Sequence, residues 1–178
     1  MLTGRKLICV DTAILKSGRE VLIRPIRADD GPRLRTGYRA LSAQSQYQRF
    51  LALKPRLSDT EVRYLVEVDG TNHYALVATT TSSPEWIIAV ARFVRAADDP
   101  EAADFAVVVG DPYQGEGLGT ELLERLADAA GARGIRRFRA SALAENVAAH
   151  KLVRRLAGRL AQEHHFGSVD EFEVDLAA

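Results

Sequence analysis

The chain has 178 residues, 47% of them hydrophobic, and its 24 basic side chains are balanced by 24 acidic ones. This size and content suffice for one buried core, so we expect a single domain over residues 1–178, and the charge balance argues against nucleic acid or an anionic membrane surface as a partner. No apolar run approaches the roughly 20 residues that cross a bilayer, the first residues lack the features of a secretory signal, and the single cysteine, Cys9, excludes an intrachain disulfide, so we expect a cytoplasmic protein.

The first part of the chain predicts a β-hairpin followed by three helices. Hydrophobic residues alternate on both sides of the turn Lys16-Ser17-Gly18-Arg19, which is typical of a hairpin. Later, the sequence Ser-Asp-Thr-Glu matches a capping box, and the apolar residues that follow it have helical spacing. The predicted elements are a hairpin from Arg5 to Ile26, a helix capped by Asp29 and Asp30 that runs to about Leu41, a helix over residues 43–53, and a helix that begins at Ser58.

The rest of the chain predicts six strands and two helices. The strands are expected at residues 74–80, 86–94, 103–109, 136–143, 159–166 and 171–176, with one helix after the third of them and another, from Asn146, after the fourth. The complete order is two strands, three helices, three strands, a helix, a strand, a helix and two strands. This order predicts an α+β fold in which helices cover both faces of a mixed sheet.

A glycine-rich loop lies between the strand and the helix that make up Phe105 to Leu126. Gly115, Gly117 and Gly119 occupy alternate positions in this loop. Without a Cβ, consecutive backbone N–H groups can turn inward, and the N-terminus of the following helix adds unpaired donors and a partial positive charge. The predicted occupant is an anionic phosphate chain.

Glycine spacing alone leaves other interpretations open. A P-loop requires Gly-Lys-Ser/Thr after the loop, which this sequence lacks. A Rossmann fingerprint requires GxGxxG early in a series of βαβ units, whereas here the spacing is GxGxG and lies after residue 110. A turn that merely connects a strand to a helix remains an alternative.

Three stretches of the sequence resemble one enzyme superfamily. Gln-x-x-Gly-x-Gly, from Gln114 to Gly119 after the strand Ala-Val-Val-Val, resembles the acyl-CoA loop of the GNAT superfamily of N-acetyltransferases. The segment RGIRRFRASALAENVAAHKLVRRLAG matches the strand and helix that follow in that superfamily. VLIRPIRADD followed by LSAQSQYQRF resembles the opening of Pat-type protein lysine acetyltransferases, so the likeness covers roughly residues 15–160. It implies a mostly antiparallel, twisted central sheet that splays between two strands, where pantetheine enters.

The resemblance also implies the cosubstrate, acetyl-CoA, and the residues that bind it. Val107 and Val109 would lend strand hydrogen bonds to pantetheine, the loop backbone would bind phosphates, and Asn146 would bond pantetheine at the mouth of the splayed strands. The side chain of Glu116 is expected to point to solvent. The predicted binding set is Val107, Val109, Gln114, Gly115, Glu116, Gly117, Leu118, Gly119, Thr120 and Asn146.

Direct acetyl transfer to an amine requires a group that takes the amine proton, because an alkylammonium with a pKa of about 10.4 is not a nucleophile. Pat-type enzymes carry a glutamate in the sequence Ala-Glu-Phe-Ala before the Ala-Val-Val-Val strand; this chain reads Ala103-Asp104-Phe105-Ala106. Asp104 is therefore the candidate base, one methylene shorter and able to act through a water molecule. The alternative is a solvated aspartate at the strand edge.

Other catalytic candidates are weaker. Many GNAT enzymes place a tyrosine acid where this chain has Val153. His150 lies one helical turn earlier and could replace it, although a solvated helix histidine is the alternative. His164 and His165 are adjacent in a strand and face opposite sides, and no cysteine cluster exists, so no metal is expected.

Three functions agree with these features. The first is acetylation of protein lysine side chains, for example on an acyl-CoA synthetase. The second is acetylation of a small amine, because a fold does not name its substrate. The third is an acyl-CoA sensor without turnover. For each of them we expect a monomer or homodimer.

Overall fold

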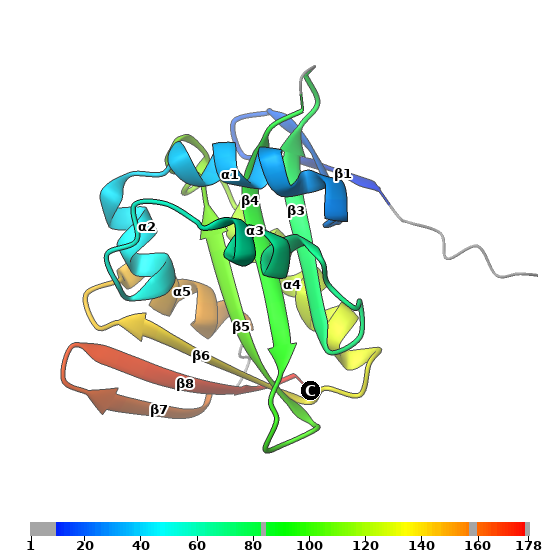
Figure 1. The fold of residues 1–178 in the computed structure, drawn as a ribbon. Helices are drawn as coiled ribbons and strands as arrows, with labels where there is room; N and C mark the ends of the chain where they lie inside the picture. Colours follow the sequence, from blue (N-terminus) through cyan, green and yellow to red (C-terminus); the bar gives the residue numbers. More distant parts are fainter. Residues whose placement is uncertain (1–9, 83–84, 157–159, 177–178) are drawn as a thin grey trace, which may run out of the picture.

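The computed structural model describes residues 10–82, 85–156 and 160–176 (Figure 1). The helices and strands follow the predicted order. Two predicted strands begin outside the described residues: the first strand of the hairpin, before residue 10, and the strand over residues 159–166, at residue 159. They are β1 (Asp11–Ile14), β2 (Glu20–Pro25), α1 (Gly31–Arg39), α2 (Ala43–Phe50), α3 (Asp59–Val66), β3 (His73–Thr80), β4 (Ile87–Arg95), β5 (Ala102–Val109), α4 (Leu118–Gly131), β6 (Arg137–Leu143), α5 (Val147–Leu156), β7 (Leu160–Phe166) and β8 (Val169–Asp175).

All eight strands form one sheet in the order β1-β2-β3-β4-β5-β6-β8-β7. Every neighbouring pair is antiparallel except β5 and β6, which are parallel. The parallel pairing covers only Ala102–Asp104 against Arg137–Arg139, and beyond it the two strands diverge (Figure 1). The predicted mostly antiparallel sheet with a splay between two strands is therefore confirmed.

Helices cover both faces of this sheet, as predicted. Against one face, α4 buries Leu122 and Leu126 on the fully buried Phe93 and Phe138. Against the other, α1 and α3 pack their apolar sides on β3 and β4. A smaller cluster joins α5 to β8. Because each face of the sheet packs on its own core, β5 and β6 are held in position from both sides where they diverge.

The start of α1 differs from the sequence prediction. Asp30 occupies the N-cap position of α1, as predicted, but its side chain makes no cap bond to this helix. The physical reason is that the Asp30 carboxylate, fully buried, instead accepts two hydrogen bonds from Arg24 at 2.7 and 2.9 Å and one from the backbone N–H of Arg27. A buried bidentate pair of this kind fixes the segment Ile-Arg-Pro-Ile-Arg on the sheet.

Of two further predicted helix boundaries, the start of α3 is confirmed and the end of α2 is wrong. The capping box at α3 is confirmed, because the Ser58 side chain accepts the N–H of Glu61 and the Glu61 carboxylate accepts the N–H of Ser58. Helix α2 ends at Phe50 rather than residue 53, since Leu51 adopts the left-handed conformation with φ of 52°. None of the described helices is long and apolar enough to cross a membrane.

The close approach of α1 to β4 gives a test of the fold. A Cβ on Gly37 would lie 2.5 Å from the carbonyl oxygen of Ile87. Because this oxygen belongs to the backbone of β4, relieving the clash would require α1 or β4 to move. We expect Gly37→Ala to lower the free energy of unfolding by roughly 1–3 kcal/mol, measured by urea denaturation. The matched control is Gly131→Ala in α4, where no atom lies within 4 Å and alanine's helix propensity should leave stability equal or higher. Equal stability of the two variants would contradict the observed packing of α1.

Candidate active site

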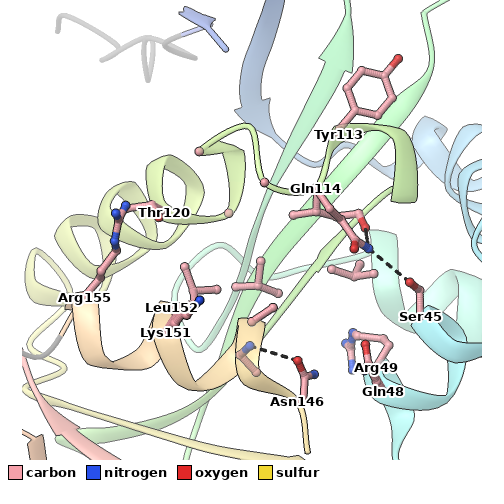
Figure 2. A pocket seen from close by; sticks show the side chains of 18 of the residues that line it. Ser45, Gln48, Arg49, Tyr113, Gln114, Thr120, Asn146, Lys151, Leu152 and Arg155 are labelled. Atoms are coloured by element: carbon pink, nitrogen blue, oxygen red, sulfur yellow. Dashed lines mark hydrogen bonds between the residues drawn. The ribbon is translucent and has the colours of Figure 1, made fainter. Parts of the chain in front are cut away.

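A cavity of about 350 Å³ opens where β5, the glycine loop and the first turns of α4 and α5 meet (Figure 2). It brings together eight of the ten residues predicted to bind the cosubstrate: Val107, Val109, Gln114, Gly115, Gly117, Gly119, Thr120 and Asn146. The other two, Glu116 and Leu118, do not line it. The Leu118 side chain is 1% exposed within the core, so only its backbone can face a ligand.

The wall formed by β5 presents backbone groups that have no neighbouring strand. The N–H of Gly110 donates to Ile88 on β4 at 2.8 Å, and in an antiparallel ladder such bonds alternate along the strand. The N–H and C=O groups of Val107 and Val109 consequently point toward β6, which has stopped pairing after Asp104. An extended ligand with its own amide groups can occupy this edge.

The glycine loop has the geometry that the sequence predicts. Gly115 and Gly117 have φ of 75° and 92°, a conformation that only glycine adopts without strain. Gly117 is the N-cap of α4, and its carbonyl accepts the N–H of Glu121, so the N–H groups of the residues in between are left for a ligand. The loop therefore offers donors and a helix N-terminus to an anion.

Glu116 differs from expectation, because its side chain does not point to solvent. Its carboxylate accepts the N–H of Ser17 at 2.8 Å and the guanidinium of Arg19 at 3.0 Å, and these hydrogen bonds hold its pKa below the usual value. Its carbonyl accepts the N–H of Lys16 at 3.2 Å. The turn between β1 and β2 is thereby fastened to the loop, and Lys16 is brought to the cavity wall, where a Cβ on Gly117 would lie 3.8 Å from its Cε.

Helix α2 is fastened to the same loop. The Ser42 hydroxyl donates to Asp111 at 2.7 Å, and the Ser45 hydroxyl donates to the same carboxylate at 2.9 Å. The Gln114 amide donates to Ser45 at 3.2 Å and to the carbonyl of Val109 at 3.0 Å (Figure 2). The serine-containing signature of α2 and the glutamine of the loop are thus parts of one network, and the Gln114 side chain acts as a support for the loop.

Four cationic side chains lie on the cavity wall and were not predicted from the sequence: Lys16, Arg49, Lys151 and Arg155. Lys151 and Arg155 are four residues apart on α5, so they share one face of that helix. This i, i+4 spacing was a usable signal in the sequence, whereas the position of Lys16 depends on the Glu116 contacts. Asn146 also lines the cavity, and its side-chain oxygen accepts the N–H of Ala149 at 3.1 Å, which leaves the NH₂ group as its free donor (Figure 2).

Asp104 lies on β5 at the end of the parallel pairing, opposite Arg139. It borders two further clefts, of about 390 and 700 Å³, which both also contain Arg49 and Phe105. Within the described part of the chain its carboxylate makes no hydrogen bond or ion pair. Burial of part of this carboxyl raises its pKa; the charge of Asp98 adds to the rise and Arg139 opposes it. These are suitable surroundings for a group that accepts a proton.

His150 and Val153 lie outside the cavity lining. Val153 is 3% exposed and packs against Phe172. His150 is not the solvated histidine considered above, because its ring contacts Phe172 edge-on and lies near the carboxylates of Glu163 and Asp170. His150 lines neither of the clefts that Asp104 borders, although Phe172, which its ring contacts, lines the larger one.

Comparison with known proteins agrees with this geometry. Residues 31–158 match the Acetyltransferase (GNAT) family. Acetyltransferase Pat of Mycolicibacterium smegmatis is 34% identical over 142 residues, which cover 80% of this chain and 42% of that protein. Acetyltransferase PA5475 of Pseudomonas aeruginosa is 31% identical over 125 residues, 70% of this chain and 67% of that one. The chain therefore spans less than half of the length of the first relative.

Solved structures show the same fold. The GNAT domain of S. lividans PAT superposes with a TM-score of 0.83 at 31% identity, covering 93% of this chain and 96% of that one. A structure from Salmonella typhimurium with its cofactor acetyl-CoA has a TM-score of 0.68 at 20% identity, covering 89% and 96%. The extent of the family match and the identity to Pat together show that this chain belongs to the GNAT family of acetyltransferases.

Proposed function

We propose that this domain transfers the acetyl group of acetyl-CoA directly to the Nε of lysine side chains in proteins, with Asp104 as the general base, in the cytoplasm. The observation that carries the proposal is the order of features along β5. Val107 and Val109 face the cavity, and Asp104 lies three residues before Val107 on the same strand, at the closed end of the splay and beside two clefts.

The cavity supplies what acetyl-CoA needs from a protein. The N–H groups of the glycine loop and the side chains of Lys16, Lys151 and Arg155 would hold the phosphates, and the free edge of β5 would bond the amides of pantetheine. A cosubstrate bound in this way would have its thioester near Phe105 and Ala106, next to Asp104. The acetyl-CoA bound by the Salmonella typhimurium protein of the same fold supports this choice of ligand.

The chemistry requires few protein groups. Asp104, directly or through one water molecule, would accept a proton from the incoming ammonium, and the resulting amine would attack the thioester carbonyl carbon. An N–H group of the β5 edge can stabilise the oxyanion of the tetrahedral intermediate. The nitrogen of that intermediate loses its second proton to water, collapse breaks the C–S bond, and CoA leaves as a thiolate, which needs no tyrosine acid because a thiol is acidic enough.

The charge of the larger cleft supports a cationic acceptor. Its lining includes Asp98, Asp104, Glu171 and Glu173 against Arg49 and Arg139. Arg139 is already paired with Asp98 at 3.2 Å and Glu173 at 3.3 Å, so the field of the remaining carboxylates favours an approaching ammonium. The volumes of the two clefts, about 390 and 700 Å³, and the resemblance to Pat favour a protein lysine over a small amine.

Substitution of Gly117 tests the cosubstrate site. Gly117→Val should lower acetyl-CoA affinity at least tenfold, because a side chain at this positive φ would distort the loop and intrude where a phosphate binds. The dissociation constant is measured by calorimetry. Gly134→Val is the matched control, since Gly134 has φ of 78°, lies outside the cavity and carries the same strain. An unchanged constant in Gly117→Val would reject the loop as the phosphate site.

Removal of metal ions tests the direct-transfer mechanism. Because a carboxylate base and backbone donors suffice for the reaction, turnover should be unchanged after dialysis against EDTA. Activity is measured by CoA release with a lysine peptide. A loss of turnover that zinc or magnesium restores would contradict a metal-free mechanism.

Substitution of Asp104 distinguishes an acetyltransferase from an acyl-CoA sensor. Asp104→Ala should leave acetyl-CoA affinity nearly unchanged and lower turnover by about 10²-fold or more, the usual effect of removing a general base. Asp104→Glu restores the longer carboxylate and should retain or raise activity. Because the base works ionised and its pKa is raised, activity of the unmutated chain should be lost on the acid side, at a pH above the usual range of an aspartate.

The control for Asp104 is Asp175→Ala, which removes an exposed carboxylate on β8 outside both clefts. Wild-type turnover in Asp104→Ala would move the base elsewhere. If the unmutated chain binds acetyl-CoA tightly but releases no CoA with proteins, peptides or small amines, the sensor function is favoured. Turnover with small amines alone would favour acetylation of a small amine as the function.

A further inference from the structure

A cluster of metal-ligating side chains lies outside the cavity and clefts described above. His150 on α5, Glu163 on β7 and Asp170 on β8 each offer one ligand atom, and these atoms lie within 4.8 Å of one another. Within residues 10–82, 85–156 and 160–176, no other group of three such side chains comes this close. None of the three lines the surfaces that the proposed function uses.

The imidazole of His150 lies between the two carboxylates. Its Nε2 is 3.3 Å from Oδ2 of Asp170, and its Nδ1 is 3.6 Å from Oε1 of Glu163. The ring meets Phe172 edge-on, with centroids 5.0 Å apart and an interplanar angle of 87°. The side chains of His150 and Asp170 are only 13% and 3% exposed. Packing therefore holds the ligands together before any ion binds.

The charge of this cluster is not balanced by a permanent cation. In the described part of the chain, the ion pairs of Glu163 and Asp170 are with histidines alone and never with lysine or arginine. Removing two carboxylates from water raises the free energy of the folded chain unless a positive charge compensates them. A divalent cation would supply that charge at the point where the three side chains converge.

We propose that His150, Glu163 and Asp170 bind one divalent transition-metal ion, and that zinc is the ion that suits them. Zinc binds imidazole nitrogen and carboxylate oxygen at about 2.0–2.2 Å, so its tetrahedral ligands are roughly 3.3 Å apart. The ligand atoms lie within 4.8 Å of one another in the structure, so the side chains would have to move closer together around the ion. His165 Nδ1 lies 2.6 Å from Oδ1 of Asp170, which leaves Oδ2 for the ion and gives the outer-shell support usual for zinc ligands.

The ion would join α5 to the hairpin of β7 and β8. The metal takes no part in acetyl transfer, since its ligands do not line the clefts that Asp104 borders. It acts on stability, as any ligand does that binds the folded chain better than the unfolded one.

The test is titration of the tag-free, EDTA-stripped chain with Zn²⁺ in a calorimeter, together with its melting temperature. We expect one ion per chain and a higher melting temperature, with neither effect from Mg²⁺, which prefers oxygen ligands. Asp170→Asn and His150→Gln should each lower zinc affinity at least tenfold. His164→Gln is the matched control, because this imidazole lies on the same strand as Glu163 but is exposed and bonds Gln162 instead.

Circular dichroism and acetyl-CoA binding verify that each variant is folded. If Asp170→Asn fails to fold, Glu163→Gln replaces it, because Glu163 is the more exposed of the two carboxylates. Saturable 1:1 binding that these variants lose and His164→Gln keeps establishes the site. No saturable zinc binding, an unchanged melting temperature, or equal zinc affinity in the ligand variants and the control would overturn the proposal.

Discussion

The short parallel pairing of β5 with β6 is the constraint on which the rest of the site depends. Only three residues of each strand pair, and the last pair joins Asp104 to Arg139. Beyond it, β6 continues as the partner of β8, while β5 continues as the partner of β4. Backbone donors and acceptors that have no strand beside them need another partner, since leaving them unpaired in a buried place costs about 1–3 kcal/mol each. The open wedge is therefore a ready site for a ligand with peptide-like amides.

Segments far apart in the sequence hold the glycine loop at the mouth of this wedge. The turn between β1 and β2 reaches it through Glu116, and α2 reaches it through Asp111 and Gln114. A loop of positive-φ glycines has high conformational entropy when free. These hydrogen bonds order the loop in advance, so less conformational entropy is lost when a ligand binds. The same contacts bring Lys16 to the cavity, so the first hairpin of the chain would contribute to the proposed phosphate site.

The sequence predicted those features that depend on local patterns. Alternation, capping boxes and glycine spacing act over a few residues, so the element order and the glycine loop could be read from the chain. The errors concern the partners of side chains: the Asp30 carboxylate binds Arg24 on the neighbouring strand, and Glu116 binds the first hairpin, 99 residues away in the sequence. Lys16 and the His150 cluster escaped prediction for the same reason, because tertiary contacts alone determine their neighbours.

Alternation along β5 lets one strand serve two chemical tasks. Its odd-numbered residues turn their N–H and C=O groups into the wedge, where Val107 and Val109 can bind a cosubstrate through backbone that tolerates substitution. The proton acceptor must instead be a side chain, and the one that we propose, Asp104, lies at the edge of the two clefts. An aspartate reaches less far than a glutamate, and its partial burial raises its pKa. A short, basic carboxyl at the closed end of the wedge is suited to accept a proton through water from an amine that enters by the acidic cleft.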